Sequence, residues 1–468
     1  MQRNNPNDTI VAIATPPGAA GIGIVRISGK EALSVADKIF VSKDAVKPSG
    51  FLTYTIHYGW IVEPRAEGGT ARAEIIDEVI LTVMRAPRSY TKEDVVEINC
   101  HGGIVSLRRM LDVALKTGCR LAEPGEFTKR AFLNGRIDLA QAEAVLDIIQ
   151  AKSDAALKMG VNQLKGYLSF EINTLREELL EILSTIEATI DFPEEGLDAA
   201  ALEDLSHRLR SSSRHLQSLV EASRYGRVLR EGIHVVICGK PNTGKSSLLN
   251  ALLKQERSIV TAIAGTTRDT IEEIIDIRGI PVRIVDTAGI LEPRDLIERK
   301  AIRRCRQQMK LADLVILLFD GSTRLSKDDA LLMKRLQKKV VVAVINKVDL
   351  KQKIERERII KNFGSVVEIS AKKHTRIYLL EEAIVNMVYG GHLRPPGSAL
   401  LSNIRHIQLV KDAQKLIAEV VNSVDNKLSA ELVAQGIKDA LVYLDVLLGK
   451  KFSEDLLDKI FSEFCIGK

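Results

Sequence analysis

The stretch Gly239-Lys-Pro-Asn-Thr-Gly-Lys245-Ser246 decides the fold expected for this chain of 468 residues. It follows an apolar segment, residues 233–238, and precedes a helical pattern. Glycines in such a loop let backbone N–H groups close around phosphate oxygens, and the helix that follows directs its positive end at them. Lys245 would neutralise the β- and γ-phosphates, and the Ser246 hydroxyl would bind Mg²⁺. The loop therefore predicts a nucleotide-binding α/β domain.

Short apolar segments alternate with helical patterns around this loop. They are residues 233–238, 282–285, 314–319, 340–345 and 366–369. Strands that alternate with helices are typical of a doubly wound parallel sheet. We therefore expect a Ras-like α/β domain over residues 230–388.

Three further loops follow strands of this domain and complete a nucleotide site. Asp286-Thr-Ala-Gly289 can reach Mg²⁺ through water and sense the γ-phosphate with a backbone N–H. Asn346-Lys-Val-Asp349 ends in a carboxylate that can accept hydrogen bonds from guanine N1–H and its 2-amino group, which adenine cannot offer. Ser370-Ala-Lys372 would contact the guanine 6-oxo group. The set predicts binding of GTP and GDP rather than ATP.

The residues expected to bind nucleotide lie on these loops and on the segment between the first two. They are Asn242, Thr243, Gly244, Lys245, Ser246, Ser247, Thr261, Ala262, Ile263, Ala264, Gly265, Thr266, Thr267, Asp286, Thr287, Ala288, Gly289, Asn346, Lys347, Asp349, Ser370, Ala371 and Lys372. Gly265-Thr-Thr-Arg-Asp269 is placed to supply a switch threonine, so we expect Thr267 to bind Mg²⁺ together with Ser246.

Hydrolysis of GTP needs a separate explanation. In Ras-like proteins a glutamine after the D-x-x-G motif positions water, and here that position is Ile290. Asn242 in the phosphate loop and the oxygens of residues 261–266 suggest a potassium ion in the place that an arginine finger takes elsewhere. Glu298 could orient water, although from spacing alone a surface glutamate is the simpler interpretation.

The segments that flank this domain have different patterns. Residues 1–135 are rich in strand signals around the turn at Pro16-Pro17-Gly18, with a helix at 104–117, which predicts an α+β domain. Residues 136–229 and 389–468 carry long amphipathic helices. The simplest architecture is one helical domain, formed by these two halves, into which the α/β domain is inserted.

Composition sets only broad limits. The net charge of +6 and the pI of about 8.9 favour a polyanionic partner such as nucleic acid, although a slightly basic cytosolic protein fits as well. The N-terminus does not resemble a signal peptide, and no apolar stretch approaches the roughly 18 residues of a membrane span. Five scattered cysteines form no CxxC pair. We expect a cytoplasmic protein with reduced thiols and no membrane association.

Beside the nucleotide loops, motifs along nearly the whole chain resemble the MnmE (TrmE) family of tRNA-modifying GTPases. They are Ala14-Thr-Pro-Pro-Gly18, Gly23-Ile-Val-Arg-Ile-Ser28, His101-Gly-Gly103, Pro124-Gly-Glu-Phe127, Ala131-Phe-Leu-Asn134, Asp138-Leu-Ala-Gln-Ala-Glu143, Asp191-Phe-Pro193 and Phe464-Cys-Ile-Gly-Lys468. The resemblance implies a folate-binding, dimerising N-terminal domain and a G domain inserted into a helical domain, at the boundaries given above.

The resemblance also implies an activity. With an FAD- and NADH-dependent partner, MnmG (GidA), the family adds an aminomethyl or carboxymethylaminomethyl group to the 5-carbon of wobble uridine in certain tRNAs. The carbon would come from 5-formyl- or methylene-tetrahydrofolate. A homodimer that forms a heterotetramer with MnmG is implied, with G domains that associate across their switch faces in potassium and GTP.

Roles for single residues follow from the same resemblance. Glu298 becomes the catalytic glutamate, acting through water. The implied potassium ligands are Asn242, Thr261, Ile263 and Thr266. The implied folate contacts are Arg26, Glu97, Arg136 and Lys468. A carboxylate suits the amide and amino edge of a pterin, and basic side chains suit its glutamyl tail.

Four positions need separate comment. Cys465 is a candidate catalytic thiol near the folate site, with a packed or merely exposed thiol as the alternative. Ala262 stands where the family usually has an acidic residue, and Lys300 where it usually has glycine. Residues 373–377 lack the usual Gly-x-Gly. None of these departures removes an expected phosphate, Mg²⁺ or guanine ligand.

Two other interpretations compete with the tRNA-modifying enzyme. One is a ribosome-assembly or signalling GTPase whose flanking domains only bind RNA or protein, because the nucleotide loops serve both classes. The other is a folate-dependent transferase with a vestigial G domain, against which the intact loops argue. The motifs outside the G domain favour the tRNA-modifying enzyme.

Overall fold

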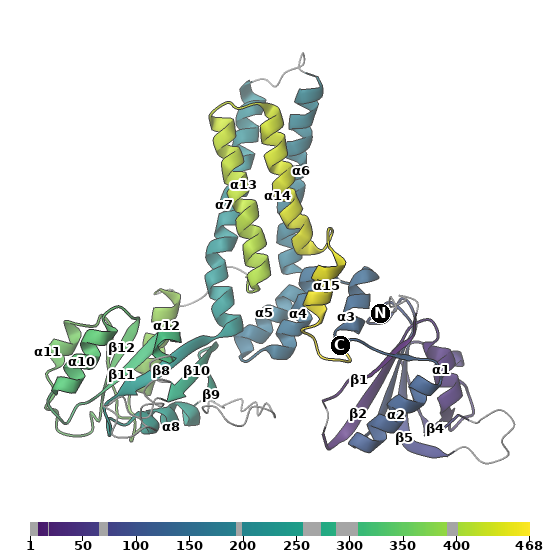
Figure 1. The fold of residues 1–468 in the computed structure, drawn as a ribbon, viewed down its shortest axis with the longest axis horizontal. Coiled ribbons are helices and arrows are strands. Elements are labelled where there is room, and N and C mark those ends of the chain that lie inside the picture. The colour runs from purple at the N-terminus through teal and green to yellow at the C-terminus, as the bar shows by residue number, and fades with distance from the viewer. Residues whose placement is uncertain are drawn as a thin grey trace. The chain divides into compact units, whose positions relative to one another are not determined.

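The computed structural model describes residues 8–16, 18–64, 74–192, 199–255, 273–286, 308–390 and 401–468. The chain divides into two compact units, Met1–Leu146 with Asp445–Lys468, and Asp147–Leu444. Figure 1 shows the helices and strands of each. In the described part of the chain, no helix is both long enough and apolar enough to span a membrane.

The first unit is built on a seven-stranded sheet, in agreement with the α+β prediction. Its strands, in the order β3-β4-β5-β6-β2-β1-β7, are β1 (Ile10–Ile13), β2 (Ala20–Ser28), β3 (Phe40–Ser42), β4 (Thr55–Val62), β5 (Ile75–Met84), β6 (Val95–Gly102) and β7 (Arg120–Leu121). Helices α1 (Ala32–Ile39) and α2 (Ile104–Lys116) share a hydrophobic core with one face of the sheet. On β5, Val79 and Leu81 are buried while Ile80 is exposed, so the opposite face of the sheet is open to solvent at this strand.

The C-terminus of the chain is anchored in this first unit. Helices α3 (Glu126–Leu133) and α15 (Glu454–Phe461) contact each other. Phe132 packs in one apolar cluster with Phe461 and Phe464. This packing holds α15 and the residues after it against α3.

Long amphipathic helices open and close the second unit, as predicted. They are α5 (Asp154–Leu164), α6 (Tyr167–Asp191), α7 (Ala199–Glu231), α13 (Ile404–Asp425) and α14 (Ala430–Leu448), of which the last, like α4 (Leu139–Gln150), crosses the division between the units. Helices α6 and α13 pack along α7 (Figure 1). Helix α7 runs through Gly226 to Glu231 without a break. A Cβ at Gly226 would lie 2.2 Å from the Leu401 carbonyl oxygen, so this glycine allows a close approach rather than a helix stop.

A six-stranded sheet between these helices forms the predicted doubly wound domain. Its strands, in the order β13-β12-β11-β8-β10-β9, are β8 (Ile233–Gly239), β9 (Glu273–Ile277), β10 (Ile280–Asp286), β11 (Leu314–Asp320), β12 (Val341–Asn346) and β13 (Val366–Glu368). All pairings are parallel except that of β9, which sequence analysis did not predict.

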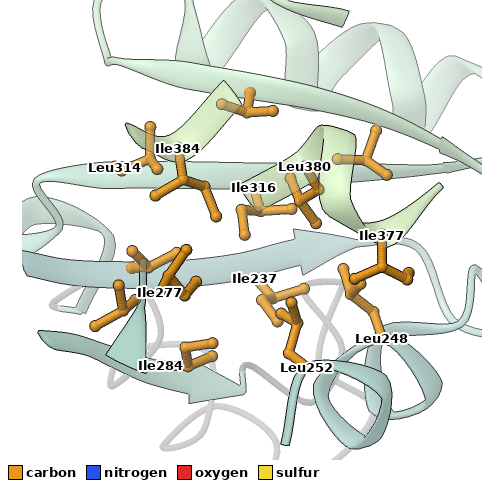
Figure 2. Close-up of a cluster of buried hydrophobic side chains, with 14 of the residues drawn as sticks. Ile237, Leu248, Leu252, Ile277, Ile284, Leu314, Ile316, Ile377, Leu380 and Ile384 are labelled. Atoms are coloured by element: carbon orange, nitrogen blue, oxygen red, sulfur yellow. The ribbon is translucent and has the colours of Figure 1, made fainter. Parts of the chain in front are cut away.

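Helices cover both faces of this sheet, which explains why its strands β11 and β12 are almost wholly apolar. The helices are α8 (Lys245–Gln255), α10 (Lys327–Leu336), α11 (Arg356–Ile360) and α12 (Ile377–Tyr389). On one face, Ile237 and Ile316 of the strands meet Leu252 of α8 and Leu380 of α12 (Figure 2). Phe319 points to the other face, where α10 packs. This core fixes the strand ends from which the nucleotide loops project.

Candidate functional site

The phosphate loop connects the end of β8 to the start of α8, as the motif predicts. Gly244, immediately before the helix, has a φ of +98°. A Cβ at this position would lie 2.3 Å from Nδ2 of Asn346, so both backbone and space require glycine. Asn242 has a φ of +63° and is exposed in the loop, where its side-chain amide can meet a ligand.

Lys245 and the two serines after it form the first turn of α8. The buried Lys245 ammonium donates hydrogen bonds to the carbonyl oxygens of Gly239, at 3.1 Å, and Lys240, at 2.9 Å. It therefore lies over the loop that the motif assigns to phosphate. Ser246 and Ser247 are exposed on the same turn, at the helix N-terminus, which favours a bound anion.

Asn346 joins the phosphate loop to both guanine loops. Its side chain is buried, with Nδ2 donating to the Thr243 carbonyl oxygen at 2.8 Å. Its Oδ1 accepts the backbone N–H of Ala371 at 2.9 Å. Three loops that are far apart in sequence are thereby held in one arrangement.

The Asp349 carboxylate, which is expected to accept hydrogen bonds from guanine, is oriented by a serine of the neighbouring loop. The Ser370 hydroxyl donates to Asp349 at 2.7 Å. This hydrogen bond, with nearby Lys373 and Lys372, holds the pKa of Asp349 below its ordinary value, so the carboxylate is ionised and can accept from guanine. A cavity of about 310 Å³ opens beside it, and its lining comes from all three loops: Gly244, Ser247, Asn346, Lys347, Asp349, Leu350 and Lys372.

The segment that lacks the family's Gly-x-Gly keeps a glycine-like backbone. His374 has a φ of +52° and Arg376 a φ of +61°, both in the left-handed region. Each such residue costs about 1 kcal/mol or more. Ser370 and Thr375 pair across this turn, which closes the guanine loop. His374 and Arg376 therefore take a backbone conformation that glycine would adopt with less strain.

Several predicted site residues lie outside the residues that the structure describes, whereas Asp286 lies at the end of β10. Backbone pairing of Asp286 with Ile237 puts the end of β10 beside β8, next to the strand that leads into the phosphate loop. The remaining residues lie outside the described part of the chain: Thr261, Ala262, Ile263, Ala264, Gly265, Thr266, Thr267, Thr287, Ala288, Gly289 and Glu298.

The first unit brings together residues expected to contact folate. Arg26 on β2 donates through Nε to Glu97 on β6 at 2.7 Å, across directly paired strands. Its Nη1 donates to the carbonyl oxygen of Gly467 at 3.0 Å. The guanidinium also lies over the Phe127 ring, 5.6 Å from its centroid. Both charged side chains are about one-fifth exposed, so this pair can be reached from solvent.

The other folate candidates lie around this pair or at the chain end. Arg136 stacks over the Tyr90 ring at 4.7 Å and donates to the Tyr90 carbonyl oxygen at 3.3 Å. The Lys468 carbonyl oxygen accepts the backbone N–H of Phe127 at 3.2 Å. Cys465 is an exposed free thiol in the same terminal segment.

Comparison with known proteins covers both units. Residues 9–136 match the family described as GTP-binding protein TrmE N-terminus, and residues 139–465 match the MnmE helical domain. The tRNA modification GTPase MnmE of Alkaliphilus metalliredigens (strain QYMF) is 45% identical over 464 residues, covering 99% of each chain. The protein of the same name from Bacillus subtilis (strain 168) is 43% identical, covering 98% of this chain and 100% of its own.

The chain belongs to the MnmE family of tRNA modification GTPases. As an MnmE family member with these nucleotide loops, it is a GTP hydrolase. The relatives match the flanking parts as well as the G domain, which favours the tRNA-modifying enzyme over the ribosome-assembly or signalling GTPase.

Three supporting side chains of this MnmE family member were missed in the sequence. Phe127 lies within the quoted motif Pro124-Gly-Glu-Phe127, but its place under Arg26 had no local signal. Tyr90 supports Arg136 across 46 positions of sequence. Asp320 ends β11 just as Asp286 ends β10, and that signal could have found it.

Gly244→Ala should weaken GDP binding at least about tenfold, because the new Cβ collides with the Asn346 amide and the left-handed backbone costs about 1–2 kcal/mol. Titration with a fluorescent GDP analogue measures the effect. Gly364→Ala is the matched control, since a Cβ there meets nothing within 4 Å and its φ is not left-handed. Equal affinities for the two variants would contradict the assigned loop geometry.

Proposed function

We propose that this chain, together with an MnmG partner, adds an aminomethyl or carboxymethylaminomethyl group to the 5-carbon of wobble uridine in certain tRNAs. The carbon is supplied by a 5-formyl- or methylene-tetrahydrofolate, and GTP hydrolysis accompanies the reaction. The main support is that Arg26, Glu97 and the C-terminal Gly467 meet in one unit of a chain whose other unit carries a guanine-nucleotide site. The reaction belongs in the cytoplasm, where tRNA is available.

The phosphate loop and the first turn of α8 bind the triphosphate in this proposal. Lys245 turns from backbone carbonyls to the β- and γ-phosphates, and the helix N-terminus supplies N–H donors. The exposed hydroxyl of Ser246 fits the preference of Mg²⁺ for oxygen ligands. Thr267 would be the second protein ligand of the ion. A Mg²⁺ ion held by these hydroxyls would offset negative charge on the phosphates.

A monovalent cation would replace the arginine finger. Asn242 fits this role because its left-handed backbone leaves its side chain exposed in the phosphate loop. Thr261, Ile263 and Thr266 would supply the remaining oxygens, and Glu298 would orient the attacking water. Potassium in this position offsets negative charge on the phosphates during hydrolysis.

The folate proposal gives separate functions to the Glu97 carboxylate and to the basic side chains around it. The Glu97 carboxylate can accept from the amide and amino edge of a pterin, exchanging its bond with Arg26 for bonds to the ligand. Arg136, held flat on Tyr90, and Lys468 are available to the glutamyl tail. Burial raises the pKa of the Tyr90 hydroxyl, so this ring stays neutral beneath the guanidinium.

A homodimer would cover the open face of the first unit's sheet. Tyr58 and Ile80 face each other across β4 and β5, and Ile56 lies on the same side. These side chains are 46%, 47% and 70% exposed, respectively. Apolar side chains clustered in this way are typical of a surface that a partner protein covers.

GTP hydrolysis should be at least about tenfold faster in potassium than in sodium at equal ionic strength, since arginine fingers in the same role contribute about 10³–10⁵-fold. Asn242→Ala should lose this response while GDP affinity stays nearly unchanged. Asn250→Ala, an exposed asparagine on α8, is the control and should respond as wild type. Equal wild-type rates in the two salts would refute the cation mechanism.

The folate assignment predicts that modification and GTP hydrolysis separate in one variant. Arg26→Gln should reduce wobble-uridine modification about tenfold or more, because a charged hydrogen-bonding group is lost, while GTP hydrolysis persists. Mass spectrometry of tRNA nucleosides from a deletion strain carrying each variant, and GTPase assays of the purified proteins, measure both. Arg109→Gln removes a surface arginine paired with Glu63 and Glu74 and is the matched control. Full modification by Arg26→Gln would remove this residue from the reaction.

A further inference from the structure

Lys347 lines the cavity next to the guanine loops, yet its charge is already neutralised inside the protein. Its Nζ donates to Oδ2 of Asp320 at 2.6 Å. The lysine side chain is 30% exposed and the aspartate side chain 13%. The ammonium therefore points to the end of β11, while Lys347 also lines the cavity.

Asp320 is itself held in place by its own strand end. Its Oδ1 accepts the backbone N–H of Ser322 at 2.9 Å and the Ser322 hydroxyl at 2.6 Å. Burial acts to raise the pKa of Asp320, but the hydrogen bonds from Lys347 and Ser322 outweigh it, so the pKa lies below its ordinary value. The carboxylate is ionised at neutral pH and both of its oxygens are used.

The backbone at Lys347 is strained, and hydrogen bonds from nearby residues hold it in this conformation. Its φ is +66°, unfavourable for a residue with a side chain. Its carbonyl oxygen accepts from Nε2 of Gln352 at 2.9 Å and from the backbone N–H of Leu350 at 3.0 Å. The Gly321 N–H donates to the Asn346 carbonyl oxygen at 2.9 Å, which ties the end of β11 to the guanine loop. The loop therefore presents Lys347 in one direction.

We propose that Asp320 is a positioning residue for guanine-nucleotide binding. By holding the ammonium, it keeps the methylene stem of Lys347 flat along the cavity as an apolar wall for the face of the base. Asp349 reads the edge of the base, whereas the stem packs against its ring irrespective of the edge groups. Without Asp320, the ammonium is better solvated away from the cavity, and the wall is lost. Phosphate contacts are made elsewhere and do not depend on this pair.

Asp320→Asn, which keeps the shape but removes the charge, should speed GDP dissociation about tenfold, as expected for loss of a charge-assisted hydrogen bond. The kcat for GTP at saturation should stay within about twofold of wild type, with the loss confined to KM. GDP and IDP, which lacks the 2-amino group, should weaken by the same factor. A merely structural defect would lower kcat as well.

Two further variants decide how Asp320 acts. Asp313→Asn is the matched control: Asp313 precedes the opposite end of the same strand and accepts the His234 N–H at 2.9 Å, so dissociation should be unchanged. In a Lys347→Met background, Asp320→Asn should add less than about twofold, because no ammonium is left to hold. Unchanged GDP dissociation in the single Asp320→Asn variant, or the same tenfold effect in both backgrounds, would overturn the proposal.

Discussion

The buried amide of Asn346 connects parts of the nucleotide site that lie on separate loops. One planar group donates to the phosphate loop at Thr243 and accepts from the guanine loop at Ala371. Either half left unpaired in the interior would cost about 1–3 kcal/mol. The amide also occupies the space that Gly244 leaves open. Distances between the phosphate and base sites are therefore set by one side chain, and the strands below it only bring the loops within its reach.

Sequence predicted what local patterns encode. Each nucleotide loop follows a continuously apolar strand, and such strands and their turns leave a signal within ten residues or so. Strand β9 was missed because it pairs on one side only and mixes Glu273 and Asp276 with its isoleucines. Gly226 lies inside α7 because it allows a close approach of Leu401, a tertiary reason that no local pattern reveals.

The features that sequence analysis did not predict depend on contacts between segments that are distant in sequence. Arg26 and Gly467 are 441 positions apart, and their hydrogen bond exists only because aromatic packing near Phe132 anchors the final helix. Tyr90 and Asp320 are similar cases: each orients a residue that the motifs identify, but neither belongs to a motif. Family resemblance named the residues expected to meet ligands, whereas the structure was needed to find the side chains that hold them.

We propose that the base specificity of this GTPase resides in Asp349, oriented by Ser370. Asp349→Asn tests it most directly, through the affinities of the purified variant for GDP and XDP. Xanthine presents a carbonyl where guanine has its amino group, and the asparagine amide can donate to that carbonyl. We expect XDP to bind more tightly than GDP to the variant, reversing the wild-type order. Retained preference for GDP would contradict the account of the site.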